Sequence, residues 1–279
     1  MMSGMTLLAL YGAAIFAVSL LGGWLPRRFP LDHNRTQMIL SLVAGLMLGV
    51  AFSHMIPHSY SAVRDVDFVM GWTLAGLVFM LLLLRWFHFH QHDFGEHAEA
   101  CSIPSEDAHD HAHAHDHAHP PVQSMGALGL LLGLCIHTVI DGVALGAVML
   151  GPEASAGFLG AGVFLAIFLH KPLDALSIET VMAASGWSSA SRTLTSIGFA
   201  LLCPAAALAF YLGMAPIASG GLWLPGALGF SAGAFICIAL GDLLPEVQFH
   251  SHDRLRLTVM FVLGIGLALS IGWIEPAGH

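Results

Sequence analysis

Residues 133–142 read GLCIHTVIDG and residues 165–174 read LAIFLHKPLD, and these two stretches decide the fold. Each places a histidine four residues before an aspartate: His137 with Asp141, and His170 with Asp174. Residues i and i+4 of a helix lie on one face, one turn apart, so each stretch predicts an imidazole and a carboxylate that point the same way. Both stretches lie inside apolar runs long enough to cross a bilayer, where ionisable side chains are costly and indicate a functional site.

The whole chain has the composition of a polytopic membrane protein. Of its 279 residues, 56% are hydrophobic and only 10% are charged, against roughly 25% charged residues in ordinary soluble domains. The mean hydropathy is +0.77. Few basic residues and a formal net charge of −9 argue against nucleic acid as a partner. The four cysteines form no CxxC pair, so we interpret them as packing residues.

Eight apolar runs are long enough to span a bilayer, which requires about 20 residues. The sequence therefore predicts an all-α integral membrane protein, folded as a single eight-helix transmembrane domain over residues 1–279. Small residues at helix-packing spacing, such as Gly142 with Gly146, indicate close contacts between helices. The expected helices cover residues 5–25, 37–59, 68–87, 125–149, 157–183, 193–214, 222–247 and 257–274.

The basic residues indicate the orientation of these helices. Seven arginines fall at or between the first and second, third and fourth, fifth and sixth, or seventh and eighth expected helices. The other connections and both tails hold only Arg64. Because cytoplasmic loops carry an excess of lysine and arginine, we expect the seven arginines to face the cytoplasm and both termini to be extracytoplasmic. The short connections and small length of the chain favour a cell membrane of one kind, the cytoplasmic membrane of a prokaryote.

One long polar segment, residues 88–121, separates the third and fourth expected helices. It contains ten histidines and seven acidic residues, without lysine or arginine. Since it has no apolar content from which to build a core, we expect a disordered cytoplasmic loop. Its imidazoles suit loose binding of zinc-class cations, and a solvated tether without a specific role is the alternative.

Two further expected helices carry a polar pair at the same spacing. His54 pairs with His58, and Asp242 pairs with Glu246. One such pair would be explained by a hydrogen bond between helices, but four pairs drawn from His, Asp and Glu alone indicate a polar path. Prolines inside three of the four helices strengthen this interpretation, because each frees a backbone carbonyl that protein or a polar cavity must satisfy. These prolines are Pro57, Pro172 and Pro245.

The depth of each pair predicts its role along such a path. Imidazoles and carboxylates are ligands for divalent transition metals, and two helices that lie side by side would supply four of them. We assign the metal site to the pairs at mid-helix: His137, Asp141, His170 and Asp174. On the orientation above, an outer approach comprises His54 and His58, and an inner exit comprises Asp242, Glu246, His250 and His252.

Lys171 is the residue that does not fit beside these ligands, because an ammonium repels a metal ion and is costly to bury unpaired. Helical geometry puts it within a turn of Asp174, so we expect it to pair with Asp174 or Asp141. Two roles stay open. The ammonium balances the charge of two buried aspartates, or it modulates the site by taking the place of a second metal and competing for the carboxylates.

At these residues the chain resembles the ZIP (Zrt/Irt-like) family of divalent metal transporters. The resemblance rests on HTVIDGVALG at 137–146, on the histidine and proline at 170–172, on the eight helices and on the His-rich loop. It implies a ZIP-like bundle that moves a zinc-class cation toward the cytoplasm. It further implies that the four mid-helix ligands contact the metal, and that the first, fourth, fifth and sixth helices move against the others.

Two positions depart from the common pattern of that family. Thr138 stands where many members have asparagine, and Lys171 stands where many have an acid. In members with a binuclear centre those positions serve the second metal. We therefore expect a single metal in this chain.

Transport of a divalent cation is the expected function, and we expect no enzymatic activity. Zn²⁺ is the expected substrate, with Fe²⁺, Mn²⁺, Co²⁺ and Cd²⁺ left open because His and Asp ligands do not separate these ions. The alternatives are an exporter of the cation-diffusion type, whose six helices fit less well than eight, and an intramembrane zinc hydrolase. The lipid bilayer is the other expected partner, and the sequence leaves a homodimer open.

Overall fold

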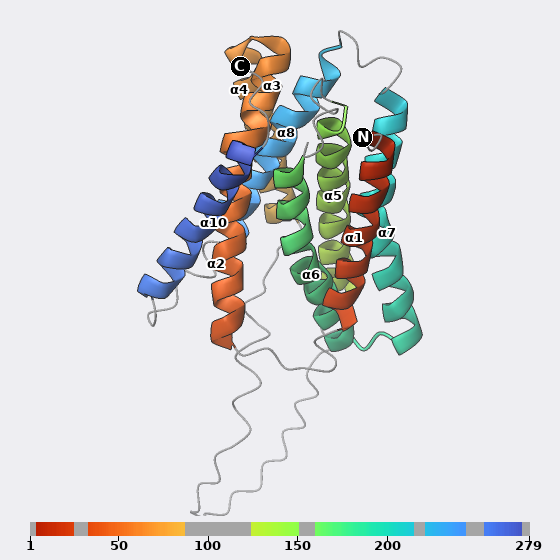
Figure 1. Cartoon of the computed structure of the whole chain (residues 1–279). Helices are drawn as coiled ribbons and strands as arrows, with labels where there is room; N and C mark the ends of the chain where they lie inside the picture. The colour runs from red at the N-terminus through yellow and green to blue at the C-terminus, as the bar shows by residue number, and fades with distance from the viewer. Residues whose placement is uncertain are drawn as a thin grey trace, which may run out of the picture.

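Helices and the turns between them make up the part of the chain that the computed structural model describes (Figure 1). The described residues are 4–24, 33–86, 124–150, 160–214, 221–243 and 254–274. Their α-helices are α1 (Gly4–Trp24), α2 (His33–Val50), α3 (Ile56–Val63), α4 (Val66–Trp86), α5 (Ser124–Val148), α6 (Ala161–Ala184), α7 (Ser189–Met214), α8 (Trp223–Ile238) and α10 (Arg254–Ile274). Two π-helical segments, η2 (Ala51–Met55) and η6 (Ala239–Leu243), extend α2 and α8.

Within these ranges, eight helices are long and apolar enough to cross a membrane, with α2, η2 and α3 forming one continuous span. The start of α1 and the end of α10 lie at the same end of the bundle, as an even number of spans requires (Figure 1). The predicted all-α architecture with eight spans is confirmed.

Side-chain caps set the starts of α4 and α7. The Asp65 carboxylate accepts hydrogen bonds from the backbone N–H groups of Asp67 and Phe68 at 3.0 and 3.1 Å. The Ser188 hydroxyl accepts one from the N–H of Ser191 at 3.2 Å. Because these caps satisfy backbone donors that have no partner within the helix, α4 and α7 begin before the predicted positions 68 and 193.

The helices sort into two groups by how closely they pack. The first group pairs α2 with α10 and α4 with α8, and α3 lies against α8. The second group pairs α5 with α7 and α1 with α6. Glycines allow the backbones to touch inside each group: a Cβ on Gly76 would collide with the Phe230 carbonyl, and a Cβ on Gly142 with the Cys203 carbonyl. Figure 1 shows α2 and α10 on one side of the bundle and α1, α6 and α7 on the other.

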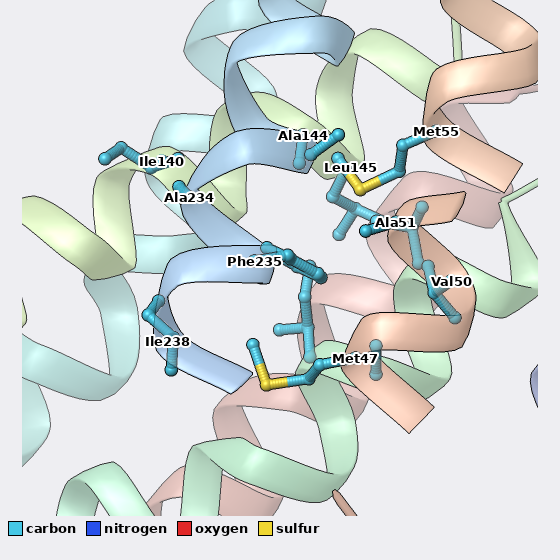
Figure 2. Close-up of a cluster of buried hydrophobic side chains, with 14 of the residues drawn as sticks. Met47, Val50, Ala51, Met55, Ile140, Ala144, Leu145, Ala234, Phe235 and Ile238 are labelled. Carbon is cyan, nitrogen blue, oxygen red and sulfur yellow. The ribbon is translucent and has the colours of Figure 1, made fainter. Parts of the chain in front are cut away.

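Apolar side chains fill the seam between the two groups (Figure 2). Phe235 of α8 is fully buried at its centre. Met47 and Met55 reach the seam from α2 and η2, and Ile140 and Leu145 reach it from α5. Helix α5 therefore turns apolar residues toward the first group. The polar residues of α5 face the neighbouring helix α6.

Candidate metal site

Helices α5 and α6 bring the four predicted ligands together. His137 and Asp141 share a face of α5, and His170 and Asp174 share a face of α6, as the spacing predicted. One ligand atom from each of the four lies within 4.8 Å of the other three. The first three residues are buried, and the Asp174 side chain keeps 15% of its surface exposed. The arrangement has the composition and size of a single-ion site.

His170 is oriented by the backbone of its own helix. Its Nδ1 donates a hydrogen bond to the Ala166 carbonyl oxygen at 2.8 Å, which leaves a lone pair on Nε2 of the neutral ring. Nε2 then faces the Asp141 carboxylate at 3.2 Å. Two acceptors at this distance repel each other unless a proton or a metal ion lies between them. A backbone carbonyl in this position is the kind of outer partner that metal-ligating histidines usually have.

His137 adds polar atoms that are buried without hydrogen-bond partners. Among the described residues, neither of its ring nitrogens is hydrogen-bonded, and the same holds for Oδ1 of Asp141. The nearest carboxylate oxygens to His137 Nε2 belong to Asp141 and Asp174, at 3.5 and 3.6 Å. Burying a polar group without a partner costs about 1–3 kcal/mol. Such atoms clustered at one point indicate a place for a ligand.

Lys171 pairs with both aspartates, where the sequence predicted one or the other. Its ammonium lies 2.6 Å from Oδ2 of Asp141 and 3.1 Å from Oδ2 of Asp174. It also donates to the Thr138 hydroxyl at 2.9 Å. These three acceptors match the three N–H bonds of an ammonium, so the buried charge is satisfied.

The two histidines of the predicted outer approach lie outside the four-ligand group. His54, in η2, donates from Nε2 to the Ala268 carbonyl of α10 at 2.8 Å. His58, in α3, donates from Nδ1 to the His54 carbonyl at 2.6 Å. Together they line a small cavity beside the end of α5 and the start of α6. The cavity is also lined by Val148, Gly160 and Val163.

The predicted inner exit cannot be compared in the same way. Asp242 lies in the π-helical segment η6, but its side chain is outside the described residues. The other members of the exit, Glu246, His250 and His252, are also outside them, as are Pro245 and the loop 88–121. These assignments stay predictions.

One buried ion pair was not foreseen from the sequence. Glu179 of α6 is buried and accepts a hydrogen bond from Nε of Arg192 on α7 at 2.9 Å, with Nη2 of the same arginine bound to the same oxygen. The signal was present, since Glu179 is an ionisable residue within the expected helix 157–183. The other sites were identified by pairs of His, Asp or Glu four residues apart. Glu179 has no such partner.

Two aromatic side chains also lie against the site, and no pattern in the sequence predicted them. The Phe235 ring meets the His170 ring edge-on, with centroids 6.1 Å apart. The Phe199 ring centroid lies 5.4 Å from the ammonium nitrogen of Lys171. Both phenylalanines come from helices other than α5 and α6, so their approach depends on tertiary packing.

Comparison with known proteins gives matches along the whole membrane-spanning part. The profile of the ZIP zinc transporter family matches residues 5–272. Zinc transporter ZIP9-B of Xenopus laevis is 26% identical over 97% of this chain and 99% of its own length. Zinc transporter ZIP9 of Xenopus tropicalis is 31% identical over 71% of this chain and 63% of its own length. Zinc transporter GufA of Myxococcus xanthus is 25% identical over 59% of this chain and 63% of its own length.

Proposed function

The chain belongs to the ZIP zinc transporter family, and we propose that it carries a divalent cation, zinc above all, through the His137, Asp141, His170 and Asp174 group toward the cytoplasm. The family is one of transporters, so the hydrolase and the cation-diffusion exporter are set aside. The observation that supports the proposal most directly is the convergence of four ligand atoms within 4.8 Å, inside two membrane-spanning helices.

The ligand set suits the energetic problem of moving a metal ion through a bilayer. An unpaired divalent ion in an apolar interior is prohibitively costly. Two imidazoles and two carboxylates replace the lost water with four ligands of the kind that zinc prefers. The ordered Nε2 of His170 lowers the cost further, because that ring needs no reorientation when an ion arrives.

Lys171 supports a stoichiometry of one ion. Its ammonium already binds the Oδ2 atoms of Asp141 and Asp174, together with Thr138. The first metal already has to share these oxygens with the ammonium, so a second metal would find no free carboxylate oxygen of this set. On the resemblance drawn from the sequence, position 171 serves the second ion in binuclear members of the family, and here a lysine occupies it.

The proposed direction of transport rests on the order of the polar residues along the helices and on the orientation given by the arginines. His54 and His58 line a cavity near the end of α5 and the start of α6. Asp174 is the most exposed of the four ligands. It lies one helical turn beyond His170 along α6, and so farther from that cavity. On the orientation given by the arginines, the cavity is extracytoplasmic and Asp174 lies one helical turn nearer the cytoplasm than His170. Asp242 and Glu246 would follow as the exit.

The two groups of helices support a rigid-body movement. Hydrogen bonds tie the first group together, from Ser41 to the Leu257 carbonyl at 2.6 Å and from Ser59 to the Pro225 carbonyl at 2.7 Å. The second group is tied by Lys171 and by the Arg192–Glu179 pair. The seam between the groups is built from apolar side chains, which carry no directional bonds to break. We propose that the second group carries the ion along this seam.

Zinc binding by the purified chain tests the site. Asp141→Asn should weaken zinc binding about a hundredfold or more, because a buried charged partner is worth 3–5 kcal/mol. The matched control is Asp67→Asn, which changes an exposed aspartate at the start of α4 and should bind zinc like the wild type. Calorimetric titration in detergent measures both. Equal affinity in the wild type and Asp141→Asn would remove Asp141 from the site.

A further inference from the structure

The ammonium of Lys171 has a fourth neighbour besides its three hydrogen-bond acceptors. The ring centroid of Phe199, on α7, lies 5.4 Å from the ammonium nitrogen. A cation within about 6 Å of an aromatic face is attracted by the ring quadrupole, most strongly where water is excluded. Lys171 is 1% exposed and Phe199 is 3% exposed, so this pair is desolvated.

Phe199 is held in place by its own packing. It forms a buried cluster with Ala175, Ile178 and Met182 of α6. Partly buried residues of α5, among them Leu134 and Cys135, complete the contact. The ring is therefore fixed between three helices, and its position relative to the ammonium does not depend on a free rotamer.

The ammonium and an arriving metal ion require the same oxygen atoms. Oδ2 of Asp141 is 2.6 Å from the ammonium and 3.2 Å from Nε2 of His170. Oδ2 of Asp174 is 3.1 Å from the ammonium and 3.7 Å from the same Nε2. When a metal binds these oxygens, the ammonium loses part of its electrostatic stabilisation while it stays buried. A neighbour that attracts cations without offering a lone pair to the metal would offset that loss.

We propose that Phe199 is a positioning residue of the transport site, acting through Lys171. Its ring holds the ammonium when the metal takes the Oδ2 atoms of Asp141 and Asp174. This inference rests on the proposed function, since it requires a metal at the four-ligand group. It gives a physical reason why a buried lysine beside a cation site is tolerated: the cost of displacing the ammonium is reduced by an aromatic face on α7.

A double-mutant cycle on the full chain in detergent tests the proposal, with zinc affinity as the readout. Phe199→Leu should weaken zinc binding by up to about tenfold when Lys171 is present, because the cation–π contact, already made without metal, strengthens once the Oδ2 atoms turn from the ammonium to the metal. In the Lys171→Met background, the same Phe199→Leu change should leave the affinity unaltered, because no ammonium is left to hold. Ile178→Val, which removes one methylene from the same cluster and keeps the aromatic face, is the matched control and should bind like the wild type.

The outcomes separate this proposal from the proposed function. Equal weakening by Phe199→Leu in both backgrounds would show a merely structural role and overturn the inference, as would no weakening in either. A wild type that binds no zinc would overturn the proposed function and this inference with it. Melting curves verify folding, and Phe199→Met replaces the leucine variant if that variant does not fold. Phe199→Tyr keeps the aromatic face and should retain wild-type affinity, so a tenfold loss there would also contradict the proposal.

Discussion

At the scale of single residues, the proposal is that two kinds of cation, a metal ion and the Lys171 ammonium, compete for two oxygen atoms. Oδ2 of Asp141 and Oδ2 of Asp174 face both histidines and Lys171. The i, i+4 spacing predicted which ligands share a helix face, and position 171 predicted its pairing with aspartate. The bond from Lys171 to Thr138 was not predicted, because it depends on how α5 and α6 are rotated against each other, which spacing along one helix does not specify.

Reversal of the charge at position 171 should change the number of bound ions. In Lys171→Glu, a third carboxylate would meet Asp141 and Asp174 in a buried site, and like charges at that distance require a neutralising cation. Elemental analysis should find two metal ions per chain, against one in the wild type. Lys171→Met serves as the control, since it removes the ammonium without adding a ligand. One ion in Lys171→Glu would contradict the account of Lys171 as a substitute for the second metal.

At the scale of elements, the polar positions coincide with irregular helix geometry. His54 lies in η2, which separates α2 from α3 within one span, and Asp242 lies in η6, which extends α8 as far as Leu243. Such single-turn π-helical segments are frequent at functional sites. The sequence predicted polar, proline-containing helices at both places. It did not predict the π-helical turns, because a shift in backbone hydrogen bonding leaves the hydrophobic pattern nearly unchanged. The early starts of α4 and α7 were missed because hydropathy ignores the caps at Asp65 and Ser188.

The close contact between α4 and α8 can be tested with two glycines of the same helix. A Cβ at Gly76 would collide with the Phe230 carbonyl, whereas a Cβ at Gly71 meets nothing within 4 Å among the described residues. Gly76→Ala should therefore destabilise the folded chain by about 1–3 kcal/mol through overpacking. Gly71→Ala should be neutral or slightly stabilising, since alanine favours a helix more than glycine does. Thermal melting in detergent checks both, and equal midpoints would refute the packing account.

At the scale of the whole molecule, the four-ligand group belongs to helices of one group and faces a seam with the other. The hydrophobic pattern predicted the eight spans because a bilayer demands long apolar helices, irrespective of their arrangement. It did not predict which helices pair. Pairing depends on close approaches such as Gly142 against Cys203 and on buried contacts such as Arg192 with Glu179, and both need the assembled bundle.

The orientation of the bundle is open to a direct labelling test. Ser61, near the end of α3, and Ser189, at the start of α7, are exposed at turns that the arginine distribution assigns to opposite faces. In intact cells, a cysteine at position 61 should react with a membrane-impermeant maleimide, and a cysteine at position 189 should react only after permeabilisation. The background should be a variant without the native cysteines. The reverse pattern would invert the proposed direction of transport.

Zinc entry into proteoliposomes tests the central claim most directly. The wild type should show saturable entry, read by an encapsulated fluorescent indicator, and His170→Ala should abolish it while the protein stays folded, because the ion loses a pre-oriented ligand at mid-membrane. Asp67→Asn, outside the site, should match the wild type. Zinc flux at the wild-type rate in folded His170→Ala would contradict the claim that the ion passes through the buried group on α5 and α6.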